Sequence, residues 1–163
     1  AHTGVVDVRI AAKAKSESEA NAMIAEIESQ IRERLGNVVF GADEDKLEEV
    51  TLDLIAKRGW TLTAIESGLD GILARRIPHT ASFSNLNPVQ FLDTLRAAQA
   101  DSHAEIALGV SAHSEDRSAE MAMISPRGEK THRITYGGPP RSLPYWATNL
   151  ALNWLRMTVE EID

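Results

Sequence analysis

The chain has 163 residues, of which 43% are hydrophobic and 25% are charged, with a formal net charge of -7. This length corresponds to one ordinary domain, or to one small and one medium domain, with enough apolar residues to bury a core. The acidic charge disfavours a nucleic-acid-binding protein, which needs a basic face to displace counterions. The absence of cysteine excludes disulfides, thiolate metal sites and a cysteine nucleophile. No apolar run reaches the length of a membrane span.

The beginning of the chain predicts a small β-α-β unit. Apolar and polar residues alternate over residues 5–15, which indicates a strand with one face in water. Ser16 and Glu19 have the spacing of a capping box, and apolar residues then recur at helical intervals up to the next glycine. A second short strand is expected over residues 38–40. Because this unit holds few apolar residues, we expect a domain boundary near Gly41.

The next segment predicts a helix, a strand and a turn with polar side chains. Acidic residues begin the helix expected over residues 43–58, and a lysine–arginine pair ends it. A short apolar strand over residues 61–65 then leads into Glu66 and Ser67. A further helix is expected from that turn to Arg76, shortly before a proline.

The second half of the chain predicts a helix, a strand, a hairpin and a last helix. Asn87 is followed by proline and opens a helix that ends near residue 98. Residues 106–110 alternate as a strand does, residues 118–136 fit a hairpin, and the last helix starts at Ser142. Alternating helices and strands followed by a hairpin predict an α/β fold with a mixed sheet. Ligands bind such sheets at the edge where strands turn into helices.

The sequence predicts no metal and no cofactor. The five histidines lack the spacing of a zinc motif, and without cysteine a transition-metal site would need side chains from distant loops. The glycine pair at residues 137–138 is followed by two prolines, which remove the backbone N–H donors that a phosphate-binding loop requires.

Ser67 and Glu66 each have two interpretations. As a nucleophile, Ser67 would lie at a helix N-terminus whose amides stabilise an oxyanion; Gly68 would let substrate approach, and a base would be needed. As a helix cap, Ser67 pairs with Asp70 three residues later. Glu66 either orients a substrate amide or a water, or is a strand-end carboxylate partly in water. The local pattern favours the cap and the strand-end carboxylate.

A longer pattern runs through the first half of the chain. Its residues are Val39-Phe40-Gly41, Asp43, Leu47-Glu48-Glu49-Val50, Thr61-Leu62-Thr63 and Glu66-Ser67. In this order they resemble the CinA family (competence/damage-inducible protein A), whose members show V-[YF]-G-x-D-x-x-x-L-E-E-V and later T-L-[AT]-x-A-E-S-C-T-G-G. The resemblance is specific over residues 5–77 and continues in outline to the last helix.

The resemblance implies part of a tripartite protein of the bacterial cytoplasm. A leading domain with nucleotide pyrophosphatase activity would precede a KH-like linking segment, here residues 1–41. A three-layer α/β/α domain, here residues 42–163, would follow; in the family it deamidates nicotinamide mononucleotide. The chain would then be a fragment that starts in a linker. The implied partners are a pyridine-nucleotide-like molecule, the leading domain and further copies of the chain, with no membrane and no nucleic acid.

The resemblance also assigns site residues. The family's nucleophile corresponds to Ser67, with Glu66 beside it as a second catalytic candidate. The residues that correspond to substrate contacts are Gly68, Ser84, Asn85, Ser111 and Arg141. No metal ligand is implied.

The family's helpers for the serine are replaced in this chain. Its tyrosine and lysine correspond to Phe83 and Pro88, and an unassisted serine attacks an amide poorly. His79 and His113 are candidate replacement bases, both expected near the same sheet edge. We favour a non-catalytic or altered-specificity relative with a binding or assembly role. The alternative is an active amidohydrolase with Ser67 as nucleophile. A nucleic-acid module is a third reading, which the lack of a basic loop disfavours.

Overall fold

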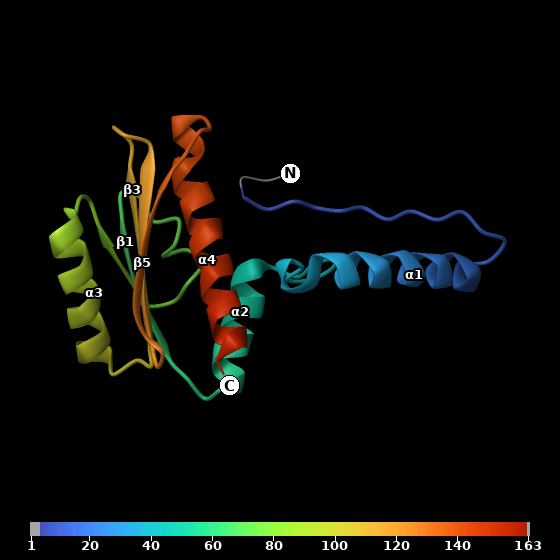
Figure 1. The fold of residues 1–163 in the computed structure, drawn as a ribbon, viewed down its shortest axis with the longest axis horizontal. Coiled ribbons are helices and arrows are strands. Elements are labelled where there is room, and N and C mark those ends of the chain that lie inside the picture. Colours follow the sequence, from blue (N-terminus) through green and yellow to red (C-terminus); the bar gives the residue numbers. More distant parts are fainter. Residues whose placement is uncertain (1–3, 163) are drawn as a thin grey trace.

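The computed structural model describes residues 4–162, which form helices around one mixed sheet (Figure 1). The elements in chain order are α1 (Glu17–Leu35), η1 (Gly36–Val38), α2 (Leu47–Lys57), β1 (Leu62–Ser67), β2 (Thr80–Phe83), α3 (Pro88–Ser102), β3 (Ile106–His113), β4 (Ser118–Ser125), β5 (Gly128–Thr135), η2 (Pro140–Ser142) and α4 (Leu143–Glu161). Over the described range, no helix combines the length and the apolar character needed to cross a membrane.

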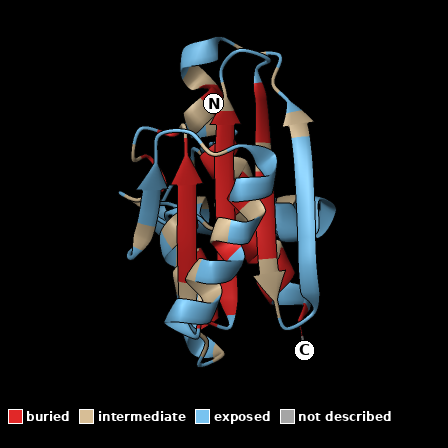
Figure 2. Cartoon of the chain, turned by 90° about the vertical axis from the view of Figure 1, so that its left-hand side faces the viewer, coloured by how far each residue is buried: buried red, intermediate tan, exposed pale blue. Residues whose placement is uncertain are grey.

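The sheet has the strand order β2-β1-β3-β4-β5. β1 pairs in parallel with β2 and β3, whereas β4 is antiparallel to both of its neighbours. α3 packs on one face of the sheet, and α2 and α4 lie on the other (Figure 1). The central strands are buried and the outer strands are exposed (Figure 2). The predicted α/β fold, a three-layer arrangement with a mixed sheet, is therefore confirmed.

Two apolar clusters join the layers, one on each face of the sheet. Strand residues such as Leu108 and Val110 pack with α4 on one face. On the other face, Ile65, Ala107 and Ala122 pack with Phe91 and Leu95 of α3. β3 is buried on both sides, as expected for a central strand covered by two helical layers. Successive residues of a strand therefore face opposite helical layers, and residues two positions apart in one strand share a face.

The capping signal before α3 acts as predicted. The side chain of Asn87 accepts a hydrogen bond from the backbone N–H of Gln90, and the Gln90 side chain accepts one from the N–H of Asn87. Pro88 is the first helical residue, where its missing N–H costs nothing. This capping box fixes the end of the loop that leads from β2 into α3.

The segment between β1 and β2 differs from its prediction. A helix to Arg76 was expected, but residues 69–77 form consecutive turns. Gly68, Asp70 and Gly71 have φ angles of 65°, 53° and 75°, and left-handed backbone of this kind interrupts a helix. The apolar side chains of the segment are nevertheless buried against α2 and α4, which is why the sequence shows an apolar periodicity.

The two strands predicted at the start of the chain are also wrong. Residues 6–15 form an extended arm without strand pairing, and residues 36–38 form the short helix η1 instead of a strand. The arm lies along α1, and the two elements together project from the body of the protein (Figure 1). An alternating sequence makes a strand only where a neighbouring strand offers hydrogen bonds, and the arm has a helix as its neighbour.

Arg156 of α4 attaches the projecting part to the body. Its side chain is 1% exposed. The guanidinium donates to the carbonyl oxygen of Asn37 and to Oδ1 of Asn153, and it forms an ion pair with Glu160 at 2.7 Å. Further along the arm, a Cβ added to Gly4 would lie 3.3 Å from that of Asn149 in α4. Arg156 therefore links η1, which directly follows α1, to α4 through a buried charge.

We expect Arg156→Ala to lower the free energy of unfolding by about 2–3 kcal/mol, because it removes buried packing and strands the carbonyl of Asn37. Arg32→Ala is the matched control, since Arg32 pairs with Glu28 at the surface with 43% of its side chain exposed. That change is expected to cost less than about 1 kcal/mol. Urea unfolding followed by circular dichroism measures both, and equal losses would contradict a special role for Arg156.

Candidate functional site

A row of polar side chains crosses the sheet at the carboxyl ends of β1 and β3. Ser67 lies opposite Ser111 in the parallel pairing, and Ser111 lies opposite Glu120 in the antiparallel pairing. Ile65 lies two residues before Ser67 in β1, and Ala107 lies four residues before Ser111 in β3, so each is on the same face of its strand as the serine. Both Ile65 and Ala107 face α3. Ser67, Ser111 and Glu120 therefore all lie on the α3 face, and we call them the polar row. The register places them together although they come from three strands.

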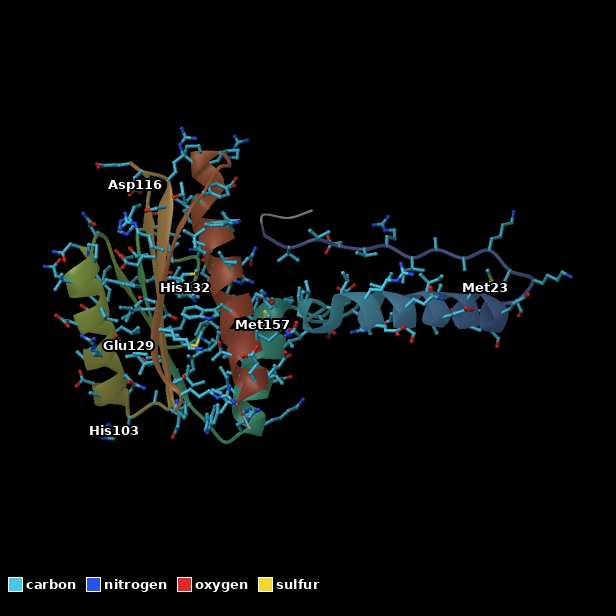
Figure 3. The ribbon with its side chains drawn as sticks, viewed as in Figure 1. Met23, His103, Asp116, Glu129, His132 and Met157 are labelled. Carbon is cyan, nitrogen blue, oxygen red and sulfur yellow. The ribbon has the colours of Figure 1, made fainter. Side chains whose placement is uncertain are left out.

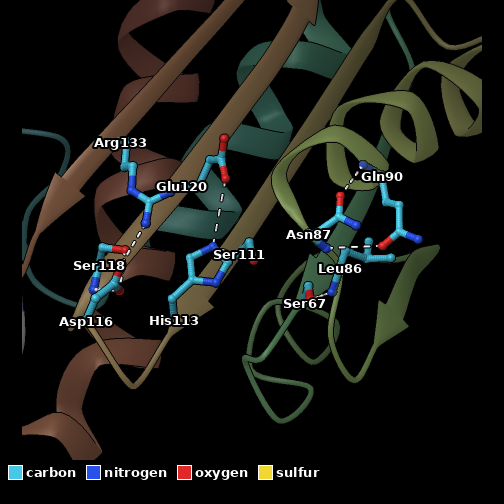
Figure 4. A network of polar contacts seen from close by, with 10 residues as sticks. All are labelled: Ser67, Leu86, Asn87, Gln90, Ser111, His113, Asp116, Ser118, Glu120 and Arg133. Atoms are coloured by element: carbon cyan, nitrogen blue, oxygen red, sulfur yellow. Dashed lines mark hydrogen bonds and ion pairs between the residues drawn. The ribbon is translucent and has the colours of Figure 1, made fainter.

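Ser67 ends β1 and is 2% exposed. Its Oγ accepts a hydrogen bond of 3.0 Å from the backbone N–H of Leu86, in the loop that leads into α3 (Figure 4). Because turns rather than a helix follow Ser67, the interpretation of Ser67 as a helix cap is wrong. The same geometry removes the helix N-terminus that would have supplied an oxyanion site. Ser67 is instead a buried tie between β1 and the loop before α3.

Gly68 is held by a close approach to β3. Its φ is 65°, and a Cβ at this position would lie 2.4 Å from the carbonyl oxygen of Ala112. Only glycine fits such a contact. The N–H of Gly68 donates to the carbonyl oxygen of Phe83 at 3.3 Å. This amide is thus already engaged within the fold.

Glu66 points to the opposite face of the sheet from Ser67. The residue is 1% exposed. Its Oε2 accepts hydrogen bonds from the N–H groups of Leu73 and Ala74 at 2.8 and 3.1 Å, and its Oε1 accepts one from the Ser82 hydroxyl at 2.7 Å. The carboxylate therefore ties the turn segment and β2 to β1. The expectation of a partly solvated strand-end carboxylate is wrong, because the turn segment folds over it.

His113 joins the polar row from the end of β3. Its Nε2 lies 3.4 Å from Oγ of Ser111 and 3.8 Å from Oε2 of Glu120 (Figure 4). Oε2 of Glu120 is buried and has no hydrogen-bond partner among the described residues. A proton on Nε2 would face both oxygens, and Nδ1 would then be the nitrogen able to accept a proton. Ser111, His113 and Glu120 thus form a compact group with acid–base capacity.

The hairpin that follows His113 is fixed by a second polar group. Oδ1 of Asp116 accepts from the hydroxyl of Ser118 at 2.7 Å, and Oδ2 pairs with Arg133 of β5 at 2.6 Å (Figure 4). The Ser118 hydroxyl, followed by the Arg133 guanidinium, holds the pKa of Asp116 below its usual range. These contacts lock the turn between β3 and β4, and so they help to hold His113 beside Glu120.

Glu120 is the site residue that sequence reasoning missed. It is an acidic residue between alanine and methionine in a strand whose other residues are mostly buried. An acid inside an apolar alternating run, at a position whose parity points inward, was the available signal. The pairing with Ser111 and His113 depends on a strand register that composition alone does not reveal.

The two candidate bases lie at opposite ends of the parallel strands. His113 ends β3, near Asp116, whereas His79 precedes β2 and lines a hollow with Trp60 and Thr61 at the start of β1. Figure 3 marks these two ends by Asp116 and His103. The expectation that both histidines share the edge of Ser67 is therefore wrong for His79, because parallel strands put the start of β2 beside the start of β1.

The remaining predicted contacts lie on exposed loops. Ser84 and Asn85 follow β2 and are exposed, in the same loop as Leu86. Arg141 lies in η2, beyond the end of β5, and is also exposed. The antiparallel pairing of β4 with β5 brings η2 to the same edge as His113. The structure thus brings Ser67, Ser111 and His113 together and leaves the loop residues around them.

The sequence is similar to a group of bacterial proteins. Residues 1–41 match the family described as "Damage-inducible protein CinA KH domain". A "CinA-like protein" of Kosmotoga olearia is 41% identical over 86 residues, which are 53% of this chain and 21% of that protein. A "Putative competence-damage inducible protein" of Caldanaerobacter subterraneus is 40% identical over 91 residues, which are 54% and 22%. The matched region is thus about a fifth of these relatives.

The fold is similar to solved structures. A competence-damaged protein (CinA) superfamily protein from Klebsiella pneumoniae has a TM-score of 0.61 at 18% identity, over 72% of this chain and 100% of that chain. A competence/damage inducible protein from Agrobacterium tumefaciens has a TM-score of 0.58 at 14% identity, over 74% and 99%. At these identities the likeness is one of fold. The sequence matches over the N-terminal half and the shared fold together confirm the resemblance to CinA proteins.

Proposed function

We propose that this chain is a CinA-like binding and assembly module that does not deamidate nicotinamide nucleotides through Ser67. Residues 1–41 would be the KH-like linking segment, and residues 42–163 a deamidase-type domain with altered chemistry, in a bacterial cytoplasm. The observation that carries the proposal is the hydrogen bond from the N–H of Leu86 to Oγ of Ser67, which uses the serine oxygen inside the fold. Three chemical requirements of a serine nucleophile support the same reading.

A serine nucleophile needs a base, oxyanion donors and access. Ser67 is 2% exposed, so substrate access requires the loop at Leu86 to move. The N–H of Gly68 already donates to Phe83, and no helix begins at this turn to offer others. Access and oxyanion stabilisation are therefore both unmet in the described arrangement, and both would have to change for turnover.

The residues that replace the family's helpers are also engaged in structure. Pro88, which corresponds to the lysine, is the first residue of α3 and has no amine to offer. Phe83, which corresponds to the tyrosine, ends β2 and has no hydroxyl. The stretch that would carry the catalytic groups has become a helix start and an edge strand. This supports loss of the ancestral chemistry rather than its rearrangement around Ser67.

A pyridine-nucleotide-like molecule remains the ligand class that we propose for the site edge. Exposed Ser84 and Asn85 offer hydrogen bonds beside β2, and Arg141 offers a positive charge for a phosphate on the same edge. Ser111 lies deeper, at 1% exposure, between these loops. Recognition by hydrogen bonds and one guanidinium needs no nucleophile, so binding without turnover is chemically consistent.

A second candidate function follows from His113. The contact of its Nε2 with Ser111 and Glu120 gives the edge a histidine that a carboxylate orients. An amidohydrolase could use Nδ1 of this histidine as the base for Ser67, the neighbour of Ser111 in the sheet. This alternative requires the Leu86 loop to release the Ser67 oxygen.

The first prediction concerns deamidation. We expect no release of ammonia from nicotinamide mononucleotide above the buffer rate, either by the chain or by its Ser67→Ala variant, at protein concentrations that detect one turnover per hour. Ammonia is measured by a coupled assay, with circular dichroism to show that both proteins are folded. Turnover that disappears in Ser67→Ala and in His113→Gln would establish the amidohydrolase instead, whereas Ala25→Glu on distant α1 is the control that leaves turnover unchanged.

The second prediction concerns Glu66, which we propose to be a structural strut rather than a catalytic group. Glu66→Ala should lower the free energy of unfolding by about 3 kcal/mol, because the buried N–H of Leu73 and the part-buried donors of Ala74 and Ser82 lose their acceptor. Glu66→Gln should cost about 1 kcal/mol, since its amide oxygen can still accept from the backbone and its NH₂ can donate to Ser82. Thermal unfolding measures both, and similar small losses for the two variants would contradict the strut.

A further inference from the structure

Glu120 carries a buried oxygen, Oε2, that has no hydrogen-bond partner among the described residues. Buried polar atoms are nearly always paired, and leaving an oxygen of a charged group unpaired costs more than leaving a neutral one. Nε2 of His113 faces this oxygen at 3.8 Å, which is too long for a hydrogen bond. The structure therefore leaves room for a partner between the carboxylate and the imidazole.

Three atoms that can bind a metal ion converge at this point. Nε2 of His113 lies 3.4 Å from Oγ of Ser111 and 3.8 Å from Oε2 of Glu120 (Figure 4). Zinc holds nitrogen and oxygen ligands at about 2.0–2.2 Å, so two ligands of one tetrahedral ion lie about 3.4 Å apart. An ion about 2.1 Å from each atom would span the two measured separations with angles of about 108° and 130°. The separations are long for hydrogen bonds and suit ligands that share one ion.

The sheet, rather than a loop, brings the three side chains together. Ser111 and His113 are two residues apart in β3 and so share a face, and Ser111 lies opposite Glu120 of β4. Over the described residues, no cluster of three or more histidine, aspartate or glutamate side chains could hold a metal ion, so the third ligand here is a hydroxyl. Spacing along the sequence does not reveal such a group, which is why no metal was expected.

Charge and access at the group also suit a cation. Arg133 of β5 lies opposite Glu120, but its guanidinium pairs with Asp116 at 2.6 Å. The negative charge of Glu120 is therefore available to a metal ion. The side chains of His113 and Glu120 are 21% and 17% exposed, so an ion can reach them from solvent and keep water as a further ligand.

We propose that Ser111, His113 and Glu120 bind one Zn²⁺ ion, whose coordination water completes. Two strong ligands and a neutral hydroxyl make an exchangeable site, because structural zinc sites have four protein ligands. The proposal goes beyond the binding function above and does not depend on it. Zinc on Nε2 would place the imidazole proton on Nδ1. A bound ion would thus remove the base that the alternative amidohydrolase requires.

Isothermal titration calorimetry of the full chain with zinc chloride, after removal of metals by a chelator, tests the proposal. We expect one saturable equivalent, which His113→Gln and Glu120→Gln each weaken at least tenfold, because losing a ligand costs at least as much as losing a group that orients one. His103→Gln is the matched control, since His103 is exposed at the far end of the strands (Figure 3). The absence of a saturable site, or equal weakening by all three changes, overturns the proposal.

Thermal unfolding separates loss of a ligand from loss of the fold. Without zinc, Glu120→Gln should be at least as stable as the unsubstituted chain, because it removes a buried charge that has no partner. Zinc at a saturating concentration should raise the unfolding midpoint of the unsubstituted chain, since it binds only the folded state. The same concentration should leave the midpoints of His113→Gln and Glu120→Gln almost unchanged. A midpoint that rises equally in all three proteins would contradict this site.

A substitution that adds a stronger ligand tests the position of Ser111. Ser111→Cys places a thiolate beside His113 in a chain that has no other cysteine. Zinc binding should become at least tenfold tighter, and the Co²⁺ complex should show thiolate-to-metal charge-transfer absorption. Ser125→Cys, at the other end of β4, is the control and should not tighten binding. If Ser111→Cys binds zinc no more tightly than Ser125→Cys, the proposed set of ligands is wrong.

Discussion

The hydrogen bonds of the buried Glu66 carboxylate are the interaction that fixes the edge of the sheet at the carboxyl ends of β1 and β3. It accepts three hydrogen bonds, two from the turn segment after β1 and one from β2. A parallel connection normally crosses the sheet face through a regular helix, whose amides are satisfied internally. Here the crossover consists of turns, and the N–H groups of Leu73 and Ala74 donate to Glu66 rather than to a backbone carbonyl. The carboxylate thereby replaces a helix in fixing where β2 lies beside β1.

The position of Ser67 follows from that arrangement. Alternation along β1 sends Glu66 to the α4 face and Ser67 to the α3 face, so one residue secures the crossover and the next secures the loop before α3. The close approach of Gly68 to Ala112 then closes the end of the strand. The three consecutive residues each hold a different neighbour. Glu66 and Ser67, the pair that a nucleophile motif would use for chemistry, are both engaged in hydrogen bonds within the fold. Loop motion, rather than side-chain rotation, would therefore have to precede any reaction at Ser67.

Apolar periodicity correctly predicted the helices and strands that bury one face. It failed where the backbone conformation depends on something other than burial, such as left-handed φ angles. The helices starting at Leu47 and Pro88, strand β3 and the hairpin of β4 and β5 were all expected. The crossover after Ser67 has helical apolar spacing, yet left-handed residues at Asp70 and Gly71 break it. At the site, Ser111 was expected through the family resemblance. The contact of His113 with Glu120 was not, because it depends on the register of β3 against β4, which only the assembled sheet defines.

The body, which is the sheet with α2, α3 and α4, and the projecting unit, which is the arm with α1, differ in how much of their apolar surface they bury. The body buries both faces of its sheet, and α4 alone contributes residues such as Ala151, Leu152 and Leu155 to the core. α1 contributes none, and Arg156 holds the end of its unit through polar contacts. Residues that a fold buries internally are fixed by that fold, whereas α1 depends on its Ser16 cap, its Glu28–Arg32 ion pair and the arm that lies along it.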